Sequence, residues 1–302
     1  MSTPLRIGMI GLDTSHVIGF TKLLNNPESE HHVPGGRVVV AYPGGSSDFE
    51  LSWSRVEGFT TQLRDDHNVQ ILDRPEAVAE ACDLVFINSC DGRVHLDQFR
   101  QTLGAKRPTF IDKPLATSLA DAAEIFRLAD ETGVPVMSSS AMRYDDSLVT
   151  ALADRSDPVV GCNVFGLIPE EPTQPGLFWY GIHSIELLVT VMGTGCRQVR
   201  ALRSDDSDLI SFVYDEGRFA SIHGLRRGKG GFGLILHLEK AGAIFVDINA
   251  MTRPRYAPLL EAVLASLPEG KSAIPTDETL EVIRLIEVAN ESRAAFGSEV
   301  SV

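Results

Sequence analysis

The chain of 302 residues lacks features that several classes of protein require. No apolar run approaches the roughly 20 residues of a membrane span, and the N-terminus has no signal-peptide pattern. Basic residues are in deficit, because 27 Lys and Arg stand against 41 Asp and Glu, for a formal net charge of −14. Nucleic acids and anionic membranes bind basic surfaces, so neither is expected as a partner.

Cysteine is also scarce. The four cysteines are scattered, without C-x-x-C spacing, at Cys82, Cys90, Cys162 and Cys196. This pattern favours reduced thiols in a cytoplasmic protein, and we expect no structural zinc or other metal. The length suits two domains of roughly 100–200 residues each.

The most informative deficit is of glycine in one turn. The segment RIGMIGLDTSH runs from a short apolar strand through a tight turn into a helix, where dinucleotide-binding folds place G-x-G-x-x-G. Gly11 fits the first glycine, but Asp13 takes the second position and His16 the third. A carboxylate at the second position adds bulk and repulsion toward a pyrophosphate. The helix amides still suit an anion, and Thr14 and Ser15 can add hydroxyls. Alternatively, Asp13 caps the helix of a pocket that has lost the dinucleotide.

Up to about residue 143, short apolar strands alternate with helical patterns. The predicted strands are 37–42, 83–88, 109–111 and 134–137, and the predicted helices are 49–66, 75–81, 95–103 and 118–132. This alternation predicts an α/β fold with a parallel, doubly wound sheet. Binding sites in such sheets lie at the carboxyl ends of the strands.

After residue 144 the pattern changes to strands joined by turn signals, such as Asp-Glu-Gly at 215–217. The predicted strands are 159–167, 199–204, 209–214, 219–223, 233–238 and 243–248, and the predicted helices are 182–192, 256–267 and 276–295. The turns favour a mostly antiparallel sheet. We therefore predict two domains, 1–143 and 144–302, the second of α+β type.

Polar residues follow two predicted strands of the first domain. Residues 88–95 close one strand and open a helix, and Asp112, Lys113 and Pro114 close the next. A lysine held at a strand's carboxyl end can bind a substrate hydroxyl and, with a lowered pKa, take part in proton transfer. The alternative is a solvated surface lysine.

A histidine in the second domain has a carboxylate at helical spacing. His183 and Glu186 share a helix face at i, i+3. His183 can then act as an acid or base that Glu186 orients. The alternative is a satisfied core histidine.

Taken in order, these segments resemble the Gfo/Idh/MocA oxidoreductase family. The order is the turn near residue 11, Asp-Lys-Pro at 112–114, Arg-Tyr at 143–144, Gly-x-His-x-x-Glu at 181–186, and a closing segment at 270–281. The resemblance covers nearly the whole chain. It implies a Rossmann domain that binds NAD or NADP and a second domain with the substrate pocket. The open sheet of that second domain often forms a dimer interface, so a homodimer or larger homo-oligomer is expected.

The resemblance also implies roles for individual residues. Lys113 would hold the reacting oxygen of a sugar, cyclitol or related polyol, and His183 would exchange the proton of that oxygen while the nicotinamide carries the hydride. Cofactor contacts are implied for Gly11, Asp13, Thr14, Ser15, His16, Ser89, Asp112 and Pro114, and substrate contacts for Arg143, Trp179, Tyr180 and Glu186.

Two departures from the family pattern leave alternatives open. Trp179 stands where an aspartate often precedes the histidine, and no acid for the ribose ends the second strand. Asp48 can turn back to the ribose, while the glycines and serines at 44–47 suit a 2′-phosphate, although no arginine occurs there before Arg55. NAD or NADP therefore stays open. Two other functions also stay open. One is that of a ligand-binding or regulatory protein without dinucleotide chemistry. The other is elimination or hydrolysis with a tightly bound cofactor that is not consumed.

Overall fold

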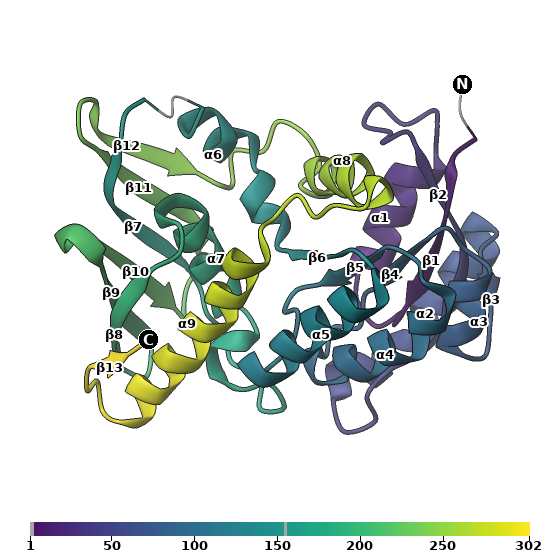
Figure 1. The fold of residues 1–302 in the computed structure, drawn as a ribbon, viewed down its shortest axis with the longest axis horizontal. Helices are drawn as coiled ribbons and strands as arrows, with labels where there is room; N and C mark the ends of the chain where they lie inside the picture. Colours follow the sequence, from purple (N-terminus) through teal and green to yellow (C-terminus); the bar gives the residue numbers. More distant parts are fainter. Residues whose placement is uncertain (1–2, 154–155) are drawn as a thin grey trace. The chain divides into compact units, whose positions relative to one another are not determined.

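The structure, a computed structural model, describes residues 3–153 and 156–302, which form two compact units (Figure 1). The first unit contains Met1–Ala116, Ala120–Ser139 and Tyr256–Thr276, and the second contains Thr117–Leu119, Ser140–Arg255 and Asp277–Val302. The break near residue 140 lies close to the expected boundary at 143. The segment 256–276 differs from the expectation because it returns to the first unit, where the ring of Tyr256 packs 5.1 Å from that of Phe20.

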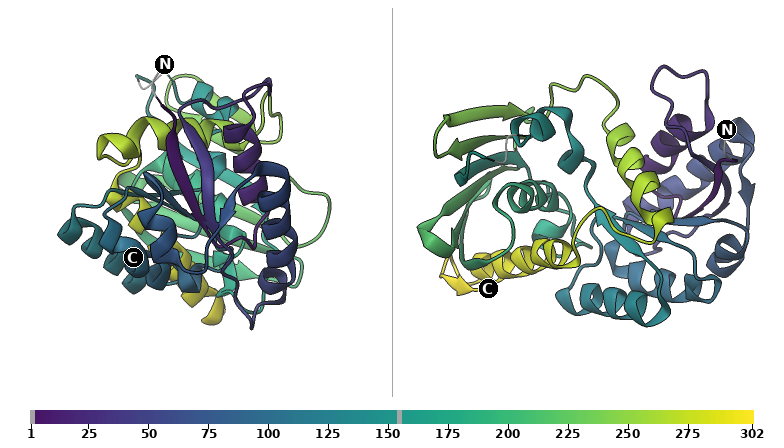
Figure 2. Two further views of the ribbon diagram at one scale, coloured as in Figure 1. Left: turned by 90° about the vertical axis from the view of Figure 1, so that its right-hand side faces the viewer. Right: turned by 45° about the horizontal axis from the view of Figure 1, so that its top comes forward.

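The first unit is built on a six-stranded parallel sheet in the order β3-β2-β1-β4-β5-β6. Its strands are β1 (Leu5–Ile10), β2 (Gly36–Tyr42), β3 (Gln70–Ile71), β4 (Leu84–Ile87), β5 (Thr109–Asp112) and β6 (Val136–Ser139). Every residue of β4, β5 and β6 is buried, as expected of a parallel sheet covered on both faces (Figure 2). The predicted doubly wound α/β fold is confirmed.

Helices connect these strands and supply the rest of the core. They are α1 (His16–Asn25), α2 (Glu50–His67), α3 (Pro75–Glu80), α4 (His95–Thr102), α5 (Leu119–Thr132) and α8 (Tyr256–Ser266). The ring centroid of Phe20 on α1 lies 6.1 Å from that of Phe86 on β4. The centroid of Phe86 in turn lies 5.2 Å from that of Phe110 on β5. These aromatic contacts pack α1 against the middle strands. Because α1 directly follows β1, its first turn lies at the carboxyl ends of the strands.

The second unit contains a seven-stranded sheet in the order β12-β11-β7-β10-β9-β8-β13. Its strands are β7 (Val159–Leu167), β8 (Cys196–Arg203), β9 (Ser207–Tyr214), β10 (Phe219–Leu225), β11 (Gly233–Leu238), β12 (Gly242–Asp247) and β13 (Val300–Ser301), and its helices are α6 (Asp146–Ala151), α7 (Gly181–Met192) and α9 (Thr276–Ala294). Only the β7–β10 pair is parallel among the described strands of this sheet. The prediction of a mostly antiparallel sheet is confirmed.

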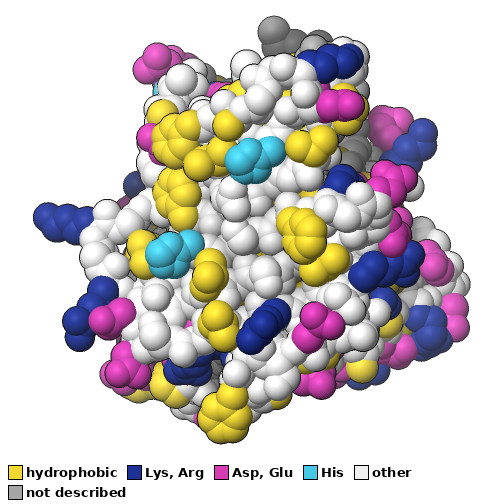
Figure 3. Space-filling view, turned by 90° about the vertical axis from the view of Figure 1, so that its left-hand side faces the viewer, with side chains coloured by type: hydrophobic (Ala, Val, Ile, Leu, Met, Phe, Trp, Pro, Cys, Tyr) yellow, Lys and Arg dark blue, Asp and Glu magenta, His cyan; other side chains and the backbone are white. Residues whose placement is uncertain are grey.

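Helices cover one face of this second sheet and leave the other face open. On the covered side, α7 packs against β7 and β10, and the Ser292 hydroxyl of α9 accepts a hydrogen bond from the Ala201 amide of β8 at 2.9 Å. On the open side, Leu209, Phe219 and Phe245 are 51%, 61% and 62% exposed. Apolar side chains are spread over this face (Figure 3). None of the described helices is long and apolar enough to cross a membrane.

Candidate active site

The turn after β1 lies directly against the end of β4. Gly11 has φ +87°, and a Cβ placed there would lie 2.5 Å from the Ser89 nitrogen, so both the conformation and the space require glycine. The Leu12 amide donates to the Pro43 carbonyl at 2.6 Å, which extends the pairing of β1 with β2. The first glycine of the sequence motif thus serves the close packing of three strand ends.

Asp13, at the second glycine position, is wholly buried. Its carboxylate accepts hydrogen bonds from the Cys90 amide at 2.9 Å and from the Ser52 hydroxyl at 2.6 Å. Burial and this nearby carboxylate raise the pKa of the Cys90 thiol. Asp13 makes no side-chain cap to α1, so the prediction that it caps this helix is wrong. It joins the turn, α2 and the loop after β4.

The first turn of α1 keeps the features of an anion site. In the described part of the chain, the amides of Asp13, Thr14 and Ser15 have no hydrogen-bond acceptor. Ser15 is exposed and Thr14 is 8% exposed. Unpaired amides at a helix N-terminus carry partial positive charge and suit a phosphate; of the three residues Ser15 is the exposed one, whereas Asp13 is buried. This part of the turn fits a dinucleotide although two glycines are replaced.

A second polar group at this edge is Asn88, which directly follows β4. Its side chain is wholly buried, and neither its amide nitrogen nor its amide oxygen has a partner among the described residues. A buried amide without partners costs about 1–3 kcal/mol, which a bound group can recover. The hydroxyl of the neighbouring Ser89, to which the resemblance gives a cofactor contact, donates to Gln98 at 3.0 Å. The position of Asn88 at a strand end was the available signal for it.

The loops after β2 and β4 are joined by charged side chains. The Ser46 hydroxyl donates to Asp91 at 2.6 Å, and Arg93 bridges Asp91 at 2.8 Å and Asp48 at 2.9 Å. The hydrogen bond from Arg93 lowers the pKa of Asp48. The sequence offered no arginine near this loop before Arg55, but the fold brings Arg93 there from the loop after β4, across the end of β1. Asp48 is thus held by Arg93.

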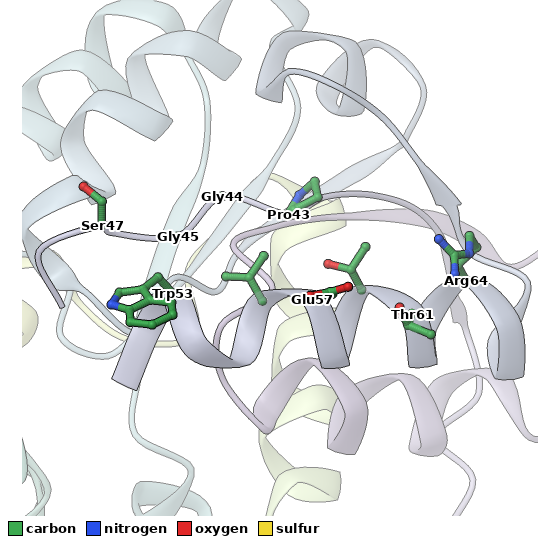
Figure 4. Close-up of a pocket in the computed structure, with 10 residues that line it drawn as sticks. Pro43, Gly44, Gly45, Ser47, Trp53, Glu57, Thr61 and Arg64 are labelled. Carbon is green, nitrogen blue, oxygen red and sulfur yellow. The ribbon is translucent and has the colours of Figure 1, made fainter. Parts of the chain in front are cut away.

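A groove of about 670 Å³ runs between the loop after β2 and α2 (Figure 4). Gly44 and Gly45 form one wall, and Trp53, Glu57 and Arg64 project from the helix on the other. The indole is 54% exposed and is therefore available for stacking. The groove lies on the α2 side of the loop, whose other side contacts the turn after β1, since a Cβ at Gly44 would be 3.2 Å from the Gly11 Cα.

The Asp-Lys-Pro segment begins at Asp112, the last residue of β5, and is held by two histidines. Asp112 is 4% exposed, and its carboxylate lies 2.5 Å from His16 Nδ1 while accepting the Lys113 amide at 2.8 Å. Burial would raise the pKa of Asp112, but His16 and Lys113 outweigh burial and lower that pKa. The buried His95 lies 2.9 Å from the Pro114 carbonyl. Asp112 and Pro114, which the resemblance assigns to the cofactor, flank Lys113. Their contacts with His16 and His95 therefore also fix the backbone on either side of this lysine.

In the second unit, His183 lies in the first turn of α7, and its partner is a serine. The Ser140 hydroxyl lies 2.7 Å from His183 Nδ1. Glu186, expected to orient the histidine, accepts the Ser140 amide at 2.8 Å and Arg143 Nε at 3.2 Å. Arg143, expected to bind substrate, is also held by Glu278 at 2.8 Å. Both Glu186 and Arg143 thus have hydrogen-bond partners within the protein.

The two aromatic residues assigned to the substrate lie beside this histidine. Trp179 and Tyr180 precede α7, with their ring centroids 5.8 Å apart, and the ring of Tyr180 lies 5.6 Å from that of His183. Aromatic faces of this kind suit the apolar side of a sugar ring. Among residues 3–153 and 156–302, the His, Cys, Asp and Glu side chains form no group of three arranged for a metal ion.

Comparison with protein families gives one match. Residues 5–140 match the sequence profile of the Gfo/Idh/MocA family, described as an oxidoreductase family with an NAD-binding Rossmann fold. The match confirms the resemblance over residues 5–140, which include the turn near residue 11 and Asp-Lys-Pro at 112–114. No curated protein matches the chain.

Solved structures with a similar fold cover nearly the whole chain. GenD2 from gentamicin A biosynthesis, in complex with NAD, has 19% identity and a TM-score of 0.78, covering 100% of this chain and 97% of its own. The myo-inositol 2-dehydrogenase from Lactobacillus plantarum has 16% identity and a TM-score of 0.78, covering 99% and 100%. The myo-inositol dehydrogenase from Lactobacillus casei, in complex with NAD(H) and myo-inositol, has 15% identity and a TM-score of 0.74, covering 99% and 97%. At these identities the likeness establishes the fold.

The lowered pKa of Asp112 makes stability dependent on pH in a defined direction. A carboxyl whose folded pKa lies below its unfolded value of about 3.9 stabilises the fold above that pH, and this contribution is lost as the pH falls through the folded pKa. His16→Phe keeps a ring beside Phe20 and Tyr256 but removes the partner of Asp112. We expect about 3 kcal/mol lower unfolding free energy at pH 7, with the difference shrinking below pH ~4. Urea unfolding of both proteins between pH 3 and pH 8 measures it, and a difference independent of pH would contradict it.

Proposed function

We propose that this protein is an NAD(P)-dependent oxidoreductase, because residues 5–140 match the profile of an oxidoreductase family with an NAD-binding Rossmann fold. It transfers a hydride between the nicotinamide and the hydroxyl or carbonyl carbon of a sugar, cyclitol or related polyol. One observation carries the proposal. The unpaired amides of the α1 turn, the unpartnered amide of Asn88 and Lys113 follow β1, β4 and β5, which are neighbours in one sheet.

In this proposal the amides of Asp13, Thr14 and Ser15 bind the pyrophosphate. Asn88 binds a polar group of the cofactor that reaches the end of β4. We further propose a preference for NAD over NADP, because Arg93 is already neutralised by Asp48 and Asp91. A 2′-phosphate would have to displace Asp48 from Arg93, whereas a ribose diol can donate hydrogen bonds to that carboxylate.

The proposed chemistry divides between the cofactor and the chain's own residues. When bound, the nicotinamide supplies hydride exchange. Lys113 binds the reacting oxygen and stabilises the negative charge that develops on it. His183 exchanges the proton of that oxygen. Trp179 and Tyr180 contact the sugar-like ring, and Glu186 and Arg143 hold the segment that carries Ser140.

The substrate class is supported by the family resemblance and by the solved relatives. One of those relatives was solved with myo-inositol and NAD(H), and a second is a myo-inositol 2-dehydrogenase. Lys113 and His183, which the ordered motifs align with the family's lysine and histidine, add the acid and base groups that oxidation of an alcohol requires. Cyclitols and sugars are therefore the first compounds to assay.

A second function, ligand binding without redox chemistry, is favoured by one observation. Asp13 replaces a glycine, and the loop after β2 lies close against Gly11. A protein of this second kind would bind a polyol without any nicotinamide requirement. Binding of the cofactor separates the two functions.

The first test is a fluorescence titration with NADH and NADPH. We expect saturable energy transfer from tryptophan to NADH, with weaker binding of NADPH, and Trp53→Phe and Trp179→Phe identify which indole responds. Lys113→Ala should retain NADH binding but lower turnover of an active cyclitol or sugar by at least about 10²-fold, the usual contribution of a group that stabilises the transition state. Lys22→Ala, at an exposed lysine of α1, is the control. Failure of both nucleotides to bind, or wild-type turnover by Lys113→Ala, would overturn the proposal.

Asn88→Leu separates cofactor binding from folding. The side chain has no partner among the described residues, so we expect the melting temperature to be unchanged or raised. NADH affinity should fall by about 3- to 10-fold, for a lost hydrogen bond of about 0.5–1.5 kcal/mol. Asn290→Leu is a matched control, because its amide binds Leu177 and Pro175, and it should lower stability without weakening NADH binding. Unchanged NADH affinity in Asn88→Leu would exclude Asn88 from the cofactor site.

We also propose that the open face of the second sheet forms a homodimer interface. Its large exposed apolar side chains are unusual for a monomer surface. Phe219→Glu with Phe245→Glu should convert a dimer to a monomer in light scattering, because desolvating carboxylates there is unfavourable. Leu51→Glu, on α2 of the first unit, should leave the mass unchanged. A monomeric wild-type protein at micromolar concentration would contradict the proposal.

A further inference from the structure

The proposed acid–base histidine has an uncharged partner that the sequence motifs did not include. Ser140 follows β6, and its hydroxyl lies 2.7 Å from His183 Nδ1. The side chain is 1% exposed, so water does not compete for this contact. The sequence pointed to Glu186 instead, which is bonded to the Ser140 amide and to Arg143.

Ser140 is itself held in place from two sides. Its hydroxyl oxygen accepts the Met142 amide at 3.2 Å, as the cap of the short helix Ala141–Tyr144. Its own amide donates to the buried carboxylate of Glu186 at 2.8 Å. Arg143 Nε binds the other oxygen of that carboxylate at 3.2 Å. The hydroxyl therefore presents a fixed oxygen to the imidazole.

The His183 ring is also restricted on its faces and edges. The ring of Tyr180 lies 5.6 Å away at 80°, and that of Phe232 lies 5.6 Å away at 74°. Both are edge-to-face contacts, which favour one orientation of the ring. With Nδ1 directed at Ser140, Nε2 is the ring atom assigned to exchange a proton with substrate.

We propose that Ser140 is a positioning residue that holds neutral His183 in the tautomer with its proton on Nδ1. This inference rests on the proposed function. A base that accepts a proton at Nε2 needs a lone pair there, so the ring proton must be on Nδ1. The Ser140 oxygen has two lone pairs, of which the Met142 amide uses one and Nδ1–H can use the other.

The proton transfer then balances without a further group. During alcohol oxidation, the substrate O–H bond breaks and an Nε2–H bond forms, which leaves an imidazolium that still donates Nδ1–H to Ser140. In the reverse direction Nε2 returns the proton to the carbonyl oxygen. Because the hydroxyl is neutral, it orients both states of His183 without the electrostatic preference for imidazolium that a carboxylate partner provides.

The test is a nitrogen-15 and carbon-13 NMR titration of histidine-labelled protein, with the His183 signals identified by their loss in His183→Gln. We expect the Nδ1–H tautomer in the wild type, and its loss in Ser140→Ala.

Ser140→Asp can still cap the short helix but adds a charge, so it should raise the pKa of His183 by about one unit or more. Ser140→Thr keeps the hydroxyl and should restore the wild-type tautomer. Ser184→Ala, which removes a neighbouring buried hydroxyl without a described partner, should change neither property.

Turnover gives a second readout once a substrate is known. Ser140→Ala should lower kcat about 10-fold with little change in KM, and Ser140→Asp should move the acidic limb of the pH profile upward. A wild-type tautomer with the proton on Nε2, or an unchanged tautomer in Ser140→Ala, would overturn the assignment even if NADH binds. Failure of NADH to bind, with the NMR result as expected, would overturn the oxidoreductase function and leave the position of Ser140 intact.

Discussion

The buried carboxylate of Asp13 is the interaction on which the candidate site most depends. It receives hydrogen bonds from the Cys90 amide and the Ser52 hydroxyl, and so joins the turn after β1 to α2 and to the loop after β4. A buried charge is stable only when its oxygens are hydrogen-bonded, so these segments must be in register for the fold to form. The amides of the α1 turn and the side chain of Asn88 take their positions from the same contacts. In the sequence motif, a carboxylate in place of the second glycine is expected to repel a pyrophosphate. In the folded chain, this same carboxylate of Asp13 orders the site.

Several other residues marked by the sequence act in the same indirect way. Asp112 is paired with His16, and Arg143 is shared between Glu186 and Glu278. Each carries charge in a protein interior, where pairing offsets the cost of removing it from water. These pairs fix the backbone beside Lys113 and Ser140. Asn88, which the motifs do not single out, has by contrast no partner for its side chain among the described residues.

Much of the fold could be predicted from local patterns. The strand expected at 159–167 and the helix expected at 182–192 match β7 and α7 within one residue, because each has a strong apolar period and a clear turn signal. The two-residue strands β3 and β13 were missed because their pairing is decided by distant strands. The parallel pairing of β7 with β10 was also out of reach, since it joins segments far apart in the sequence. The return of α8 to the first unit follows from contacts of Tyr256 that no local pattern records.

The sequence by itself determined the α/β class, the position of the turn at Gly11, the strand end that carries Lys113 and the helix that carries His183. These depend on period, turn residues and spacing, which are properties of neighbouring residues. The tertiary structure alone decided the partners: Ser140 for His183, Arg93 for Asp48, and the Cys90 amide for Asp13. Each of these pairs joins residues more than 40 positions apart. Long-range pairs form only where the fold brings distant segments together, and the identity of either residue alone does not specify that encounter.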